Sequence, residues 1–453
     1  PTYTRDSIRR QRQMCIRDSF QAASISKPVA ATAALRLVEQ GVLELDVPVN
    51  QYLTSWTLPE NDFTREAPVT LRHLLTHTGG LTVHGFPGYA VSDEVASTIQ
   101  VLDGSGPANT DPIRVDTLPG SLWRYSGGGY TIMQQLLEDV TGQPFPQILR
   151  ELVLDPAGME LSSFQQPLPP ARSSYAATAH LRDGTPLEGN WHIYPEMAAA
   201  GLWTNPTELA YLAMELQAAF HGEEGRVLSP EMARAMFTSG LADWGLGFTL
   251  SGEGEDARFT HGGSNRGFKA QFYAYVEGGR GAFIMTNGDQ GGTLAREILL
   301  AVAREYGWPD PSYREETLAE VPQEILEEIA GEYRVEGAED LVLKVTVVDD
   351  HLRGEVGELD EFELYPMADD FFIDLENGAR LRVDRDEQGE VTALQVLGGP
   401  RAVRVRQREP GKMEEGVGPI RECFHRVGRH HPPTIMSEKK VEESAVGAGK
   451  RTA

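Results

Sequence analysis

Residues 24–40 read SISKPVAATAALRLVEQ, and this stretch decides the fold. Residues 28–40 are apolar at helical spacing, begin with Pro28 and stop before Gly41, so they predict a helix. If Ser24 lies at the helix N-terminus, Lys27 returns to the same face one turn later. A serine hydroxyl is a weak nucleophile until a base removes its proton, and a desolvated lysine can be that base. The S-x-x-K pattern therefore predicts a nucleophile beside its base; the alternative for Ser24 is an ordinary N-cap.

A second segment, Tyr125-Ser126-Gly127-Gly128-Gly129-Tyr130, lies at a predicted junction between a loop and a helix. A tyrosine at this place could relay protons between a nucleophile and a leaving group. The alternative is a packing tyrosine beside a flexible turn.

A third segment, His261-Gly262-Gly263-Ser264, lies on a predicted strand. Glycines on a strand allow a substrate backbone to lie close to the strand edge. A strand N–H group could also pair with the Ser24 N–H group as an oxyanion hole, and one such donor is worth about 3 kcal/mol. Taken alone, His261 would be a structural or surface histidine.

In this order the three segments resemble the serine β-lactamase and penicillin-binding-protein superfamily, in particular its class C β-lactamase-like branch of esterases, peptidases and β-lactamases. Further matching stretches are LLTHTGGL at 74–81, AGLW at 200–203, WGLGF at 244–248 and HGGSNRGF at 261–268. The resemblance covers about 20–308. It implies an α+β fold, in which an antiparallel sheet flanked by helices lies beside an all-helical subdomain, with the site between them.

The resemblance also implies a role for each matching residue. Ser24 would be the acylated nucleophile, and Lys27 and Tyr125 would share the general base and acid roles, with their division left open. His261 would stand where other members have lysine. It would support the tyrosine and could also bind a carboxylate group of the substrate. The backbone amides of Ser24 and Ser264 would form the oxyanion hole.

Three glycines complete the predicted site. Gly262 and Gly263 belong to the strand along which the substrate would lie. Gly127 stands where the family motif has asparagine, so the side-chain amide that would hold a substrate amide is missing. We expect a roomier and less selective site, which favours ester or small-peptide hydrolysis over β-lactamase or carboxypeptidase activity.

Changes of pattern along the chain predict five parts. Residues 1–19 are Arg-rich, resemble adapter-derived translation at the ends of metagenomic reading frames, and could instead be a genuine basic tail. The other parts are a mixed α and β domain at 20–308, a Pro- and Glu-rich linker at 309–322, a run of short strands at 323–408 that predicts a small β-barrel or sandwich, and a disordered tail at 409–453. The resemblance implies that 20–308 is a serine hydrolase domain, and 323–408 resembles the lipocalin-like barrel that often follows such hydrolases. The barrel would cap the cleft, contact a substrate or partner, or only stabilise the protein.

Composition limits the partners. The chain has 453 residues and a formal net charge of −26, which argues against binding nucleic acid or anionic lipid. No stretch approaches the roughly 20 apolar residues of a transmembrane helix. We expect a small-molecule or peptide substrate, no metal and no cofactor. Zinc-type residues in the tail, namely Cys423, His425, His430 and His431, lie in a segment that looks unstructured.

The sequence therefore predicts a serine hydrolase that acts through an acyl-enzyme on Ser24, with esters, amides or D-amino-acid peptides as substrates. The alternative is a binding or regulatory protein on the same fold with a weak or inactive site, and a metal hydrolase comes third. The family resemblance suggests a periplasmic or secreted protein. The chain starts at Pro1, so its native N-terminus and any signal peptide are not observed. The oligomeric state is not predicted.

Overall fold

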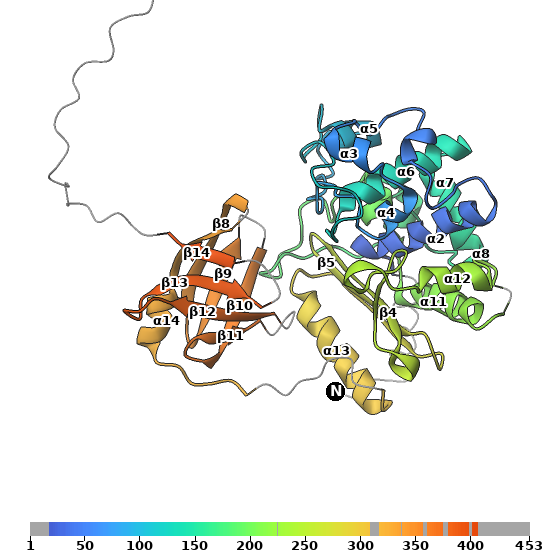
Figure 1. The fold of residues 1–453 in the computed structure, drawn as a ribbon. Helices are drawn as coiled ribbons and strands as arrows, with labels where there is room; N and C mark the ends of the chain where they lie inside the picture. The colour runs from blue at the N-terminus through green and yellow to red at the C-terminus, as the bar shows by residue number, and fades with distance from the viewer. Residues whose placement is uncertain are drawn as a thin grey trace, which may run out of the picture.

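The structure is a computed structural model that describes residues 18–405, except 224, 309–316, 337, 357–359, 375–378 and 398–400. Residues 1–17, most of the predicted linker and the predicted tail with its Cys and His cluster lie outside the described residues. The N-terminal domain combines helices with an antiparallel sheet, and a closed β-barrel follows it (Figure 1). The predicted α+β fold class with an additional all-β barrel is thus confirmed, whereas the predicted domain limits stay predictions.

The buried helix α2 (Ser26–Glu39) forms the centre of the N-terminal domain. Its residues Val29, Ala33 and Leu35 are fully buried, and its many alanines allow neighbouring elements to approach closely. The helix begins two residues before the predicted Pro28. Further helices of the helical part are α3 (Asp62–Glu66), α4 (Leu71–Leu75), α5 (Thr98–Asp103), α6 (Gly127–Thr141), α7 (Phe145–Leu149), α8 (Asp155–Ala157), α9 (Pro170–Ser173) and α10 (Met197–Ala200).

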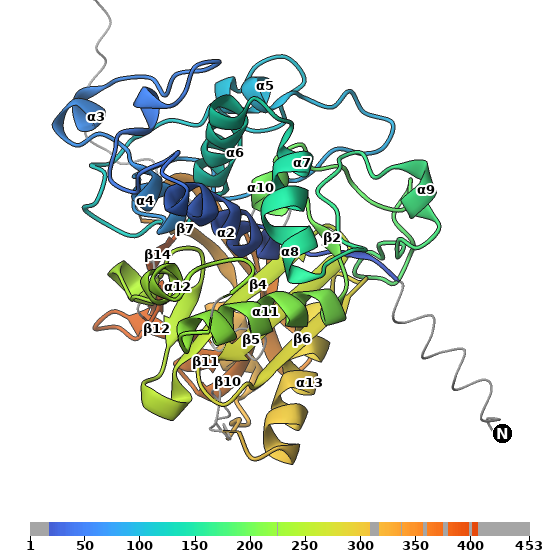
Figure 2. The ribbon, with the colours of Figure 1, turned by 90° about the vertical axis from the view of Figure 1, so that its right-hand side faces the viewer.

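The antiparallel sheet has the strand order β3-β4-β5-β6. Its strands are β3 (Thr249–Ser251), β4 (Arg258–Asn265), β5 (Phe268–Tyr275) and β6 (Gly281–Thr286), and the helices α11 (Pro206–Phe220), α12 (Pro230–Met236) and α13 (Gly291–Glu305) complete this part. Phe272 of β5 packs into the main core, while Tyr273 packs against α13. Because successive strand residues face opposite sides, both faces of the sheet are buried, and Figure 2 shows helices on either side of it.

A short two-stranded ladder joins the start of the described chain to this domain. Strand β1 (Phe20–Gln21) pairs antiparallel with β2 (Trp203–Thr204). The Ala22 N–H group then donates to the Leu202 carbonyl at 2.8 Å. These bonds hold the backbone just before Ser24 against the segment that follows α10.

The barrel closes through a strand that the sequence pattern did not reveal. Its strands are β7 (Gly331–Val335), β8 (Ala338–Val348), β9 (His351–Val356), β10 (Asp360–Ala368), β11 (Phe371–Ile373), β12 (Arg380–Arg385), β13 (Val391–Val396) and β14 (Arg401–Arg404). Strand β7 pairs with both β8 and β14 and so completes the ring. Leu326 and Ile329 of helix α14 (Gln323–Ile329) belong to one hydrophobic cluster with buried barrel side chains, including Tyr333.

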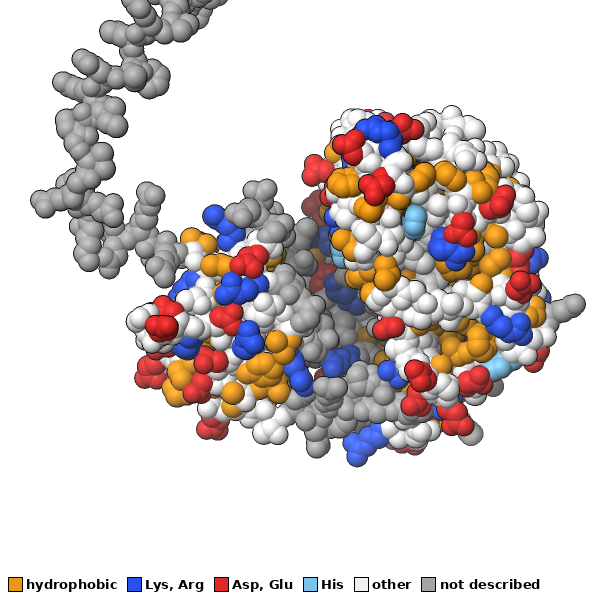
Figure 3. All heavy atoms as spheres, viewed as in Figure 1, with side chains coloured by type: hydrophobic (Ala, Val, Ile, Leu, Met, Phe, Trp, Pro, Cys, Tyr) orange, Lys and Arg blue, Asp and Glu red, His pale blue; other side chains and the backbone are white. Residues whose placement is uncertain are grey.

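Acidic and basic side chains lie next to one another over the barrel face in Figure 3. Arg385, for example, forms ion pairs with Glu328 at 2.9 Å and with Asp370 at 2.7 Å.

Among the described helices, none is both long and apolar enough to cross a membrane.

Candidate active site

Ser24 lies at the turn that leads into helix α2. The short 3₁₀ turn Ala23–Ile25 precedes the helix, and the preceding residue Ala23 has a left-handed φ of 50°. This conformation costs a residue with a Cβ atom about 1–3 kcal/mol and persists only where the surroundings impose it. Ser24 is partly exposed, whereas the neighbouring Ala22, Ala23 and Ile25 are fully buried. The turn therefore presents the serine hydroxyl at the surface of an otherwise buried segment.

Lys27 is the direct partner of Ser24. Its Nζ atom lies 3.1 Å from Ser24 Oγ and donates to the backbone carbonyl of Ala199 at 2.9 Å. The side chain is 2% exposed, and burial lowers its pKa from 10.5 to about 7. A substantial fraction of the amine is thus uncharged near neutral pH and is able to take a proton.

Tyr125 lies near the same hydroxyl. Burial raises the pKa of Tyr125 above its ordinary value of 10.0, and interaction with the Ser24 hydroxyl lowers the pKa by a smaller amount. The Lys27 Nζ atom lies 4.9 Å from the centre of the tyrosine ring. The structure thus brings Ser24, Lys27 and Tyr125 together, with a protonated phenol and a partly neutral amine beside one hydroxyl.

Two aromatic residues that sequence reasoning left without a role hold Tyr125 in place. The ring of His77 lies 4.2 Å from the Tyr125 ring, and its Nδ1 atom accepts a hydrogen bond from the Ser126 N–H group at 3.1 Å. Trp244 packs edge-on against Tyr125 at 5.8 Å. Both residues occur in the stretches LLTHTGGL and WGLGF, which carried the resemblance but gave no sign of this contact.

His261 lines the same cluster as a neutral side chain. Its ring centre is 6.3 Å from that of Tyr125, and its Nδ1 atom donates to the Gly262 carbonyl at 2.6 Å. A carbonyl can only accept, so Nε2 is the unprotonated nitrogen, and it is buried without a hydrogen-bond partner. Burial, and then the charge of Lys27, lower the pKa of His261 to about 3. A neutral ring cannot supply the positive charge that a substrate carboxylate would need.

The two glycines of strand β4 differ in their surroundings. A Cβ atom on Gly263 would lie 2.3 Å from the Ala22 carbonyl oxygen, so only glycine allows the strand to approach the segment before Ser24. Gly262 is exposed and has open space at the Cβ position. Ser264 is exposed, and its hydroxyl accepts a hydrogen bond from Lys269 at 2.6 Å. The strand thus lies against the serine turn, as an oxyanion hole built from Ser24 and Ser264 requires.

The surroundings of Gly127 contradict the expectation of a roomier site. A Cβ atom there would lie 2.9 Å from Cε2 of Phe86 and 3.0 Å from the His84 carbonyl oxygen. The space that an asparagine side chain would begin to occupy is therefore filled by another part of the chain. The sequence could not reveal this, because Phe86 is 41 positions away from Gly127.

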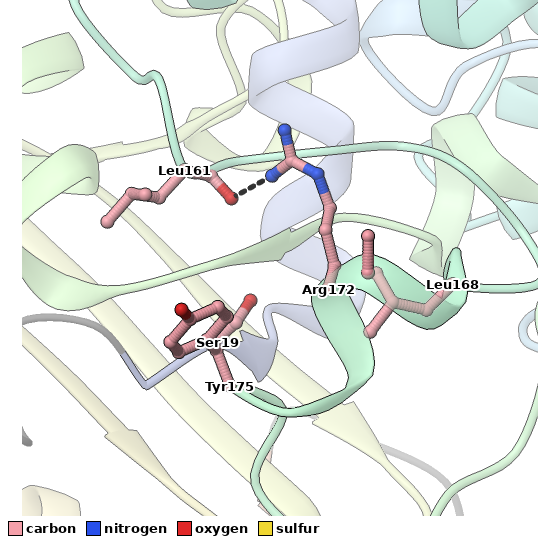
Figure 4. Close-up of a pocket in the computed structure, with 6 residues that line it drawn as sticks. Ser19, Leu161, Leu168, Arg172 and Tyr175 are labelled. Atoms are coloured by element: carbon pink, nitrogen blue, oxygen red, sulfur yellow. Dashed lines mark hydrogen bonds between the residues drawn. The ribbon is translucent and has the colours of Figure 1, made fainter.

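A separate hollow lies away from these residues. It has a volume of about 310 Å³ and is lined by Ser19, Leu161, Leu168, Ala171, Arg172 and Tyr175 (Figure 4). The Arg172 guanidinium group is held by the Leu161 carbonyl at 2.6 Å. None of the predicted catalytic residues lines this hollow. Across the described part of the chain, no cluster of three or more His, Cys, Asp or Glu side chains is arranged to hold a metal ion.

An esterase and a penicillin-binding protein are among the curated proteins with sequences similar to this chain. Esterase EstB of Burkholderia gladioli is 32% identical over 182 residues, which are 36% of this chain and 44% of EstB. Penicillin-binding protein 4* of Bacillus subtilis is 22% identical over 375 residues, 78% of this chain and 80% of the relative. The first few curated relatives are matched over about half of their own length, from 44% to 60%.

Solved structures share the fold. The octameric penicillin-binding protein homologue from Pyrococcus abyssi superimposes with a TM-score of 0.53 at 22% identity, over 85% of this chain and 88% of the other. The crystal structure of SurE gives a TM-score of 0.52 at 25% identity, over 86% and 88% of the two chains. The family model described as Beta-lactamase matches residues 4–305, which is well over half of the 453 residues. The chain therefore belongs to the beta-lactamase family.

Proposed function

We propose that this protein is a serine hydrolase that forms an acyl-enzyme on Ser24, with esters, amides or D-amino-acid peptides as its substrates. One observation carries the proposal: the buried amine of Lys27 lies 3.1 Å from the Ser24 hydroxyl oxygen. A hydroxyl beside a base of lowered pKa is the arrangement that activates a serine nucleophile. The names of two relatives, an esterase and a penicillin-binding protein, support the same class of chemistry.

In the first half of the reaction, the neutral Lys27 amine takes the proton of Ser24 as its oxygen attacks the substrate carbonyl. The carbonyl oxygen becomes an oxyanion, for which the amides of Ser24 and Ser264 are the proposed donors. The bond to the leaving group then breaks, and the leaving oxygen or nitrogen takes a proton from Tyr125. The phenolate of Tyr125 regains its proton from the Lys27 ammonium group nearby.

In the second half, water replaces the leaving group. The Lys27–Tyr125 pair removes a proton from the water, the hydroxide attacks the ester carbonyl on Ser24, and the released serine oxygen is protonated again. The raised pKa of Tyr125 suits it to donate a proton, and the lowered pKa of Lys27 suits it to accept one. We therefore assign the base role in acylation to Lys27.

The test is a hydrolysis screen over nitrophenyl esters, a penicillin and a D-aminoacyl anilide. We expect turnover of at least one ester by the wild-type protein and a loss of about 10³-fold or more in Ser24→Ala. Ser239→Ala is the matched control, because Ser239 is an exposed serine in the loop after α12. Equal rates in Ser24→Ala and Ser239→Ala would exclude the proposed function.

A further inference from the structure

The loop of residues 82–86 covers the N-terminal end of helix α6. The Gly127 N–H group donates to the His84 carbonyl at 2.9 Å, and the Gly128 N–H group donates to the Val83 carbonyl at 3.1 Å. The Ser126 hydroxyl donates to the Thr82 carbonyl at 2.8 Å. Helix N-terminal N–H groups are often free to bind a ligand, but here carbonyls of the loop take them up.

The loop is held in a conformation that the chain adopts at a cost. Val83, which is β-branched, has a left-handed φ of 61°. Such a backbone angle is a genuine outlier for this residue type and requires support from the surrounding contacts. The bonds to α6 supply this support, so we treat the loop as a fixed part of the site.

The ring of Phe86 occupies the side-chain space of residue 127. Its Cε2 atom would lie 2.9 Å from a Cβ atom on Gly127. Phe86 packs against the main core and is only partly buried. A phenyl ring can neither donate nor accept an ordinary hydrogen bond, whereas an asparagine at position 127 would do both.

This apolar surface lies beside the proposed catalytic group. Gly127 is two residues after Tyr125, whose phenol interacts with the Ser24 hydroxyl. The ring of His84, from the same loop, lies 4.9 Å from the Tyr125 ring. A substrate substituent on the Tyr125 side of the reacting carbonyl would therefore meet the 82–86 loop.

We infer that Phe86 is a specificity-determining residue that selects acyl groups with an apolar substituent over acyl groups with an amide at the same place. The inference rests on the proposed function. An amide moved from water onto a phenyl surface loses hydrogen bonds and gains none, which disfavours it, while a methylene group placed there is favoured.

The experiment compares two nitrophenyl esters of similar length, the butyrate and the N-acetylglycinate. Each kcat/KM is divided by the rate of the uncatalysed reaction in the same buffer, because the amide activates its own ester. We expect the wild-type protein to favour the butyrate about tenfold or more. Phe86→Asn should lower this ratio at least about fivefold, and the conservative variant Phe86→Leu should keep it within about twofold of wild type.

Two measurements separate specificity from folding. Thermal unfolding checks that each variant is folded, and titration of Ser24 with a small alkylphosphonate counts the active sites. A ratio that is equal in wild type, Phe86→Asn and Phe86→Leu, with Ser24-dependent hydrolysis intact, would overturn the inference and leave the proposed function standing. If neither ester is hydrolysed and Ser24 is not labelled, both the proposed function and this inference are wrong.

Discussion

The amine of Lys27 has its lowered pKa because the fold buries it beside a neutral histidine and aromatic rings. Burial is the cause of the shift to about 7, and Ala199 supplies a carbonyl, which is a neutral partner. A carboxylate at that place would have kept the amine charged. The base role that we propose for Lys27 therefore depends on two features, the 3.1 Å contact with Ser24 and a neutral hydrogen-bond partner in place of a carboxylate.

Activity should rise with pH through about 7. The folded-state pKa of Lys27 lies below its ordinary value of 10.5, so the neutral and competent amine accumulates as the pH rises through about 7. We expect kcat/KM for an activated ester to show an acid limb with this midpoint. In Lys27→Ala the acid limb of the pH profile should disappear, and kcat/KM should fall by about 10²–10⁴-fold. Because burial lowers the pKa of His261 to about 3, His261→Asn should retain a limb near pH 7, and a limb that disappears in this variant would contradict the assignment.

Glu196 is a buried carboxyl group with no role in the proposed reaction. It is fully buried, neither of its oxygens has a hydrogen-bond partner, and it lies on the segment whose Ala199 carbonyl holds Lys27. Burial raises its pKa from 4.5 to about 8. The folded protein therefore carries this proton at neutral pH, and the unfolded chain does not.

The Glu196 carboxyl should make stability fall as pH rises. Because the folded-state pKa is raised, the folded state binds one more proton than the unfolded state between about pH 4.5 and pH 8. The free energy of unfolding should decrease across this window by about 1.4 kcal/mol per pH unit, relative to Glu196→Gln. Denaturant melts at pH 5, 6, 7 and 8 measure this slope, with the exposed Glu160→Gln as control. If the free energy of unfolding has the same slope against pH in wild type and Glu196→Gln, Glu196 does not cause the pH dependence.

At the scale of the element, strand β4 is the part that connects the sheet to the serine turn. Its buried side chains His261 and Asn265 face the helical part, where the Asn265 amide donates to Gln21 at 2.8 Å and to the Ala200 carbonyl at 3.1 Å. Gly263 lies between them and against Ala22. The distance between the strand and the serine turn therefore depends on the absence of a side chain at this one position.

Gly263→Ala should separate the strand from the turn. The new methyl group would lie 2.3 Å from a backbone oxygen, which cannot move away as a flexible side chain would. We expect a loss of about 1–3 kcal/mol in stability and a fall in kcat of about tenfold or more. Gly262→Ala on the same strand has open space and should unfold like wild type. Equal unfolding midpoints for the two variants would show that β4 does not lie against the turn.

Local spacing predicts that Ser24 and Lys27 lie on one face, and the structure places the Lys27 amine 3.1 Å from the Ser24 hydroxyl oxygen. The S-x-x-K pattern alone leaves an N-cap as the alternative for Ser24. The roles of Tyr125 and His261 come from the family resemblance, and the catalytic roles of all four residues stay predictions. The hydrogen bond from Ser126 to His77 joins residues 49 positions apart, and no local pattern encodes it. The filled space beside Gly127 was missed for the same reason.

The missed strand has a different cause. In β7, the buried Tyr333 stands between the exposed Glu332 and Arg334. The alternation of buried and exposed residues is therefore present, but it extends over very few residues. The strand has only five residues, so the alternation around Tyr333 is a weak signal. Closure of the ring by pairing with β14 is what turns this weak pattern into a strand.

At the scale of the whole molecule, the barrel has a hydrophobic core of its own. Its buried residues, including Leu352 and Phe372, form one cluster, and α2 and the sheet contribute to another. Separate cores predict separate unfolding transitions. Leu352→Ala, at a fully buried position, should destabilise the barrel by about 2–5 kcal/mol. Calorimetry should show one transition lowered and one retained, while a single transition that shifts as a whole would mean that the two cores unfold together.

The central claim is that Ser24, activated by Lys27, forms a covalent bond with the acyl group of the substrate. The most direct measurement is peptide mapping by mass spectrometry after rapid acid quenching of the protein with an activated ester. We predict one acyl group per protein on the peptide that contains Ser24, a much slower appearance of it in Lys27→Ala, and none in Ser24→Ala. An acyl group on another residue, or ester hydrolysis that continues at the wild-type rate in Ser24→Ala, would contradict the claim.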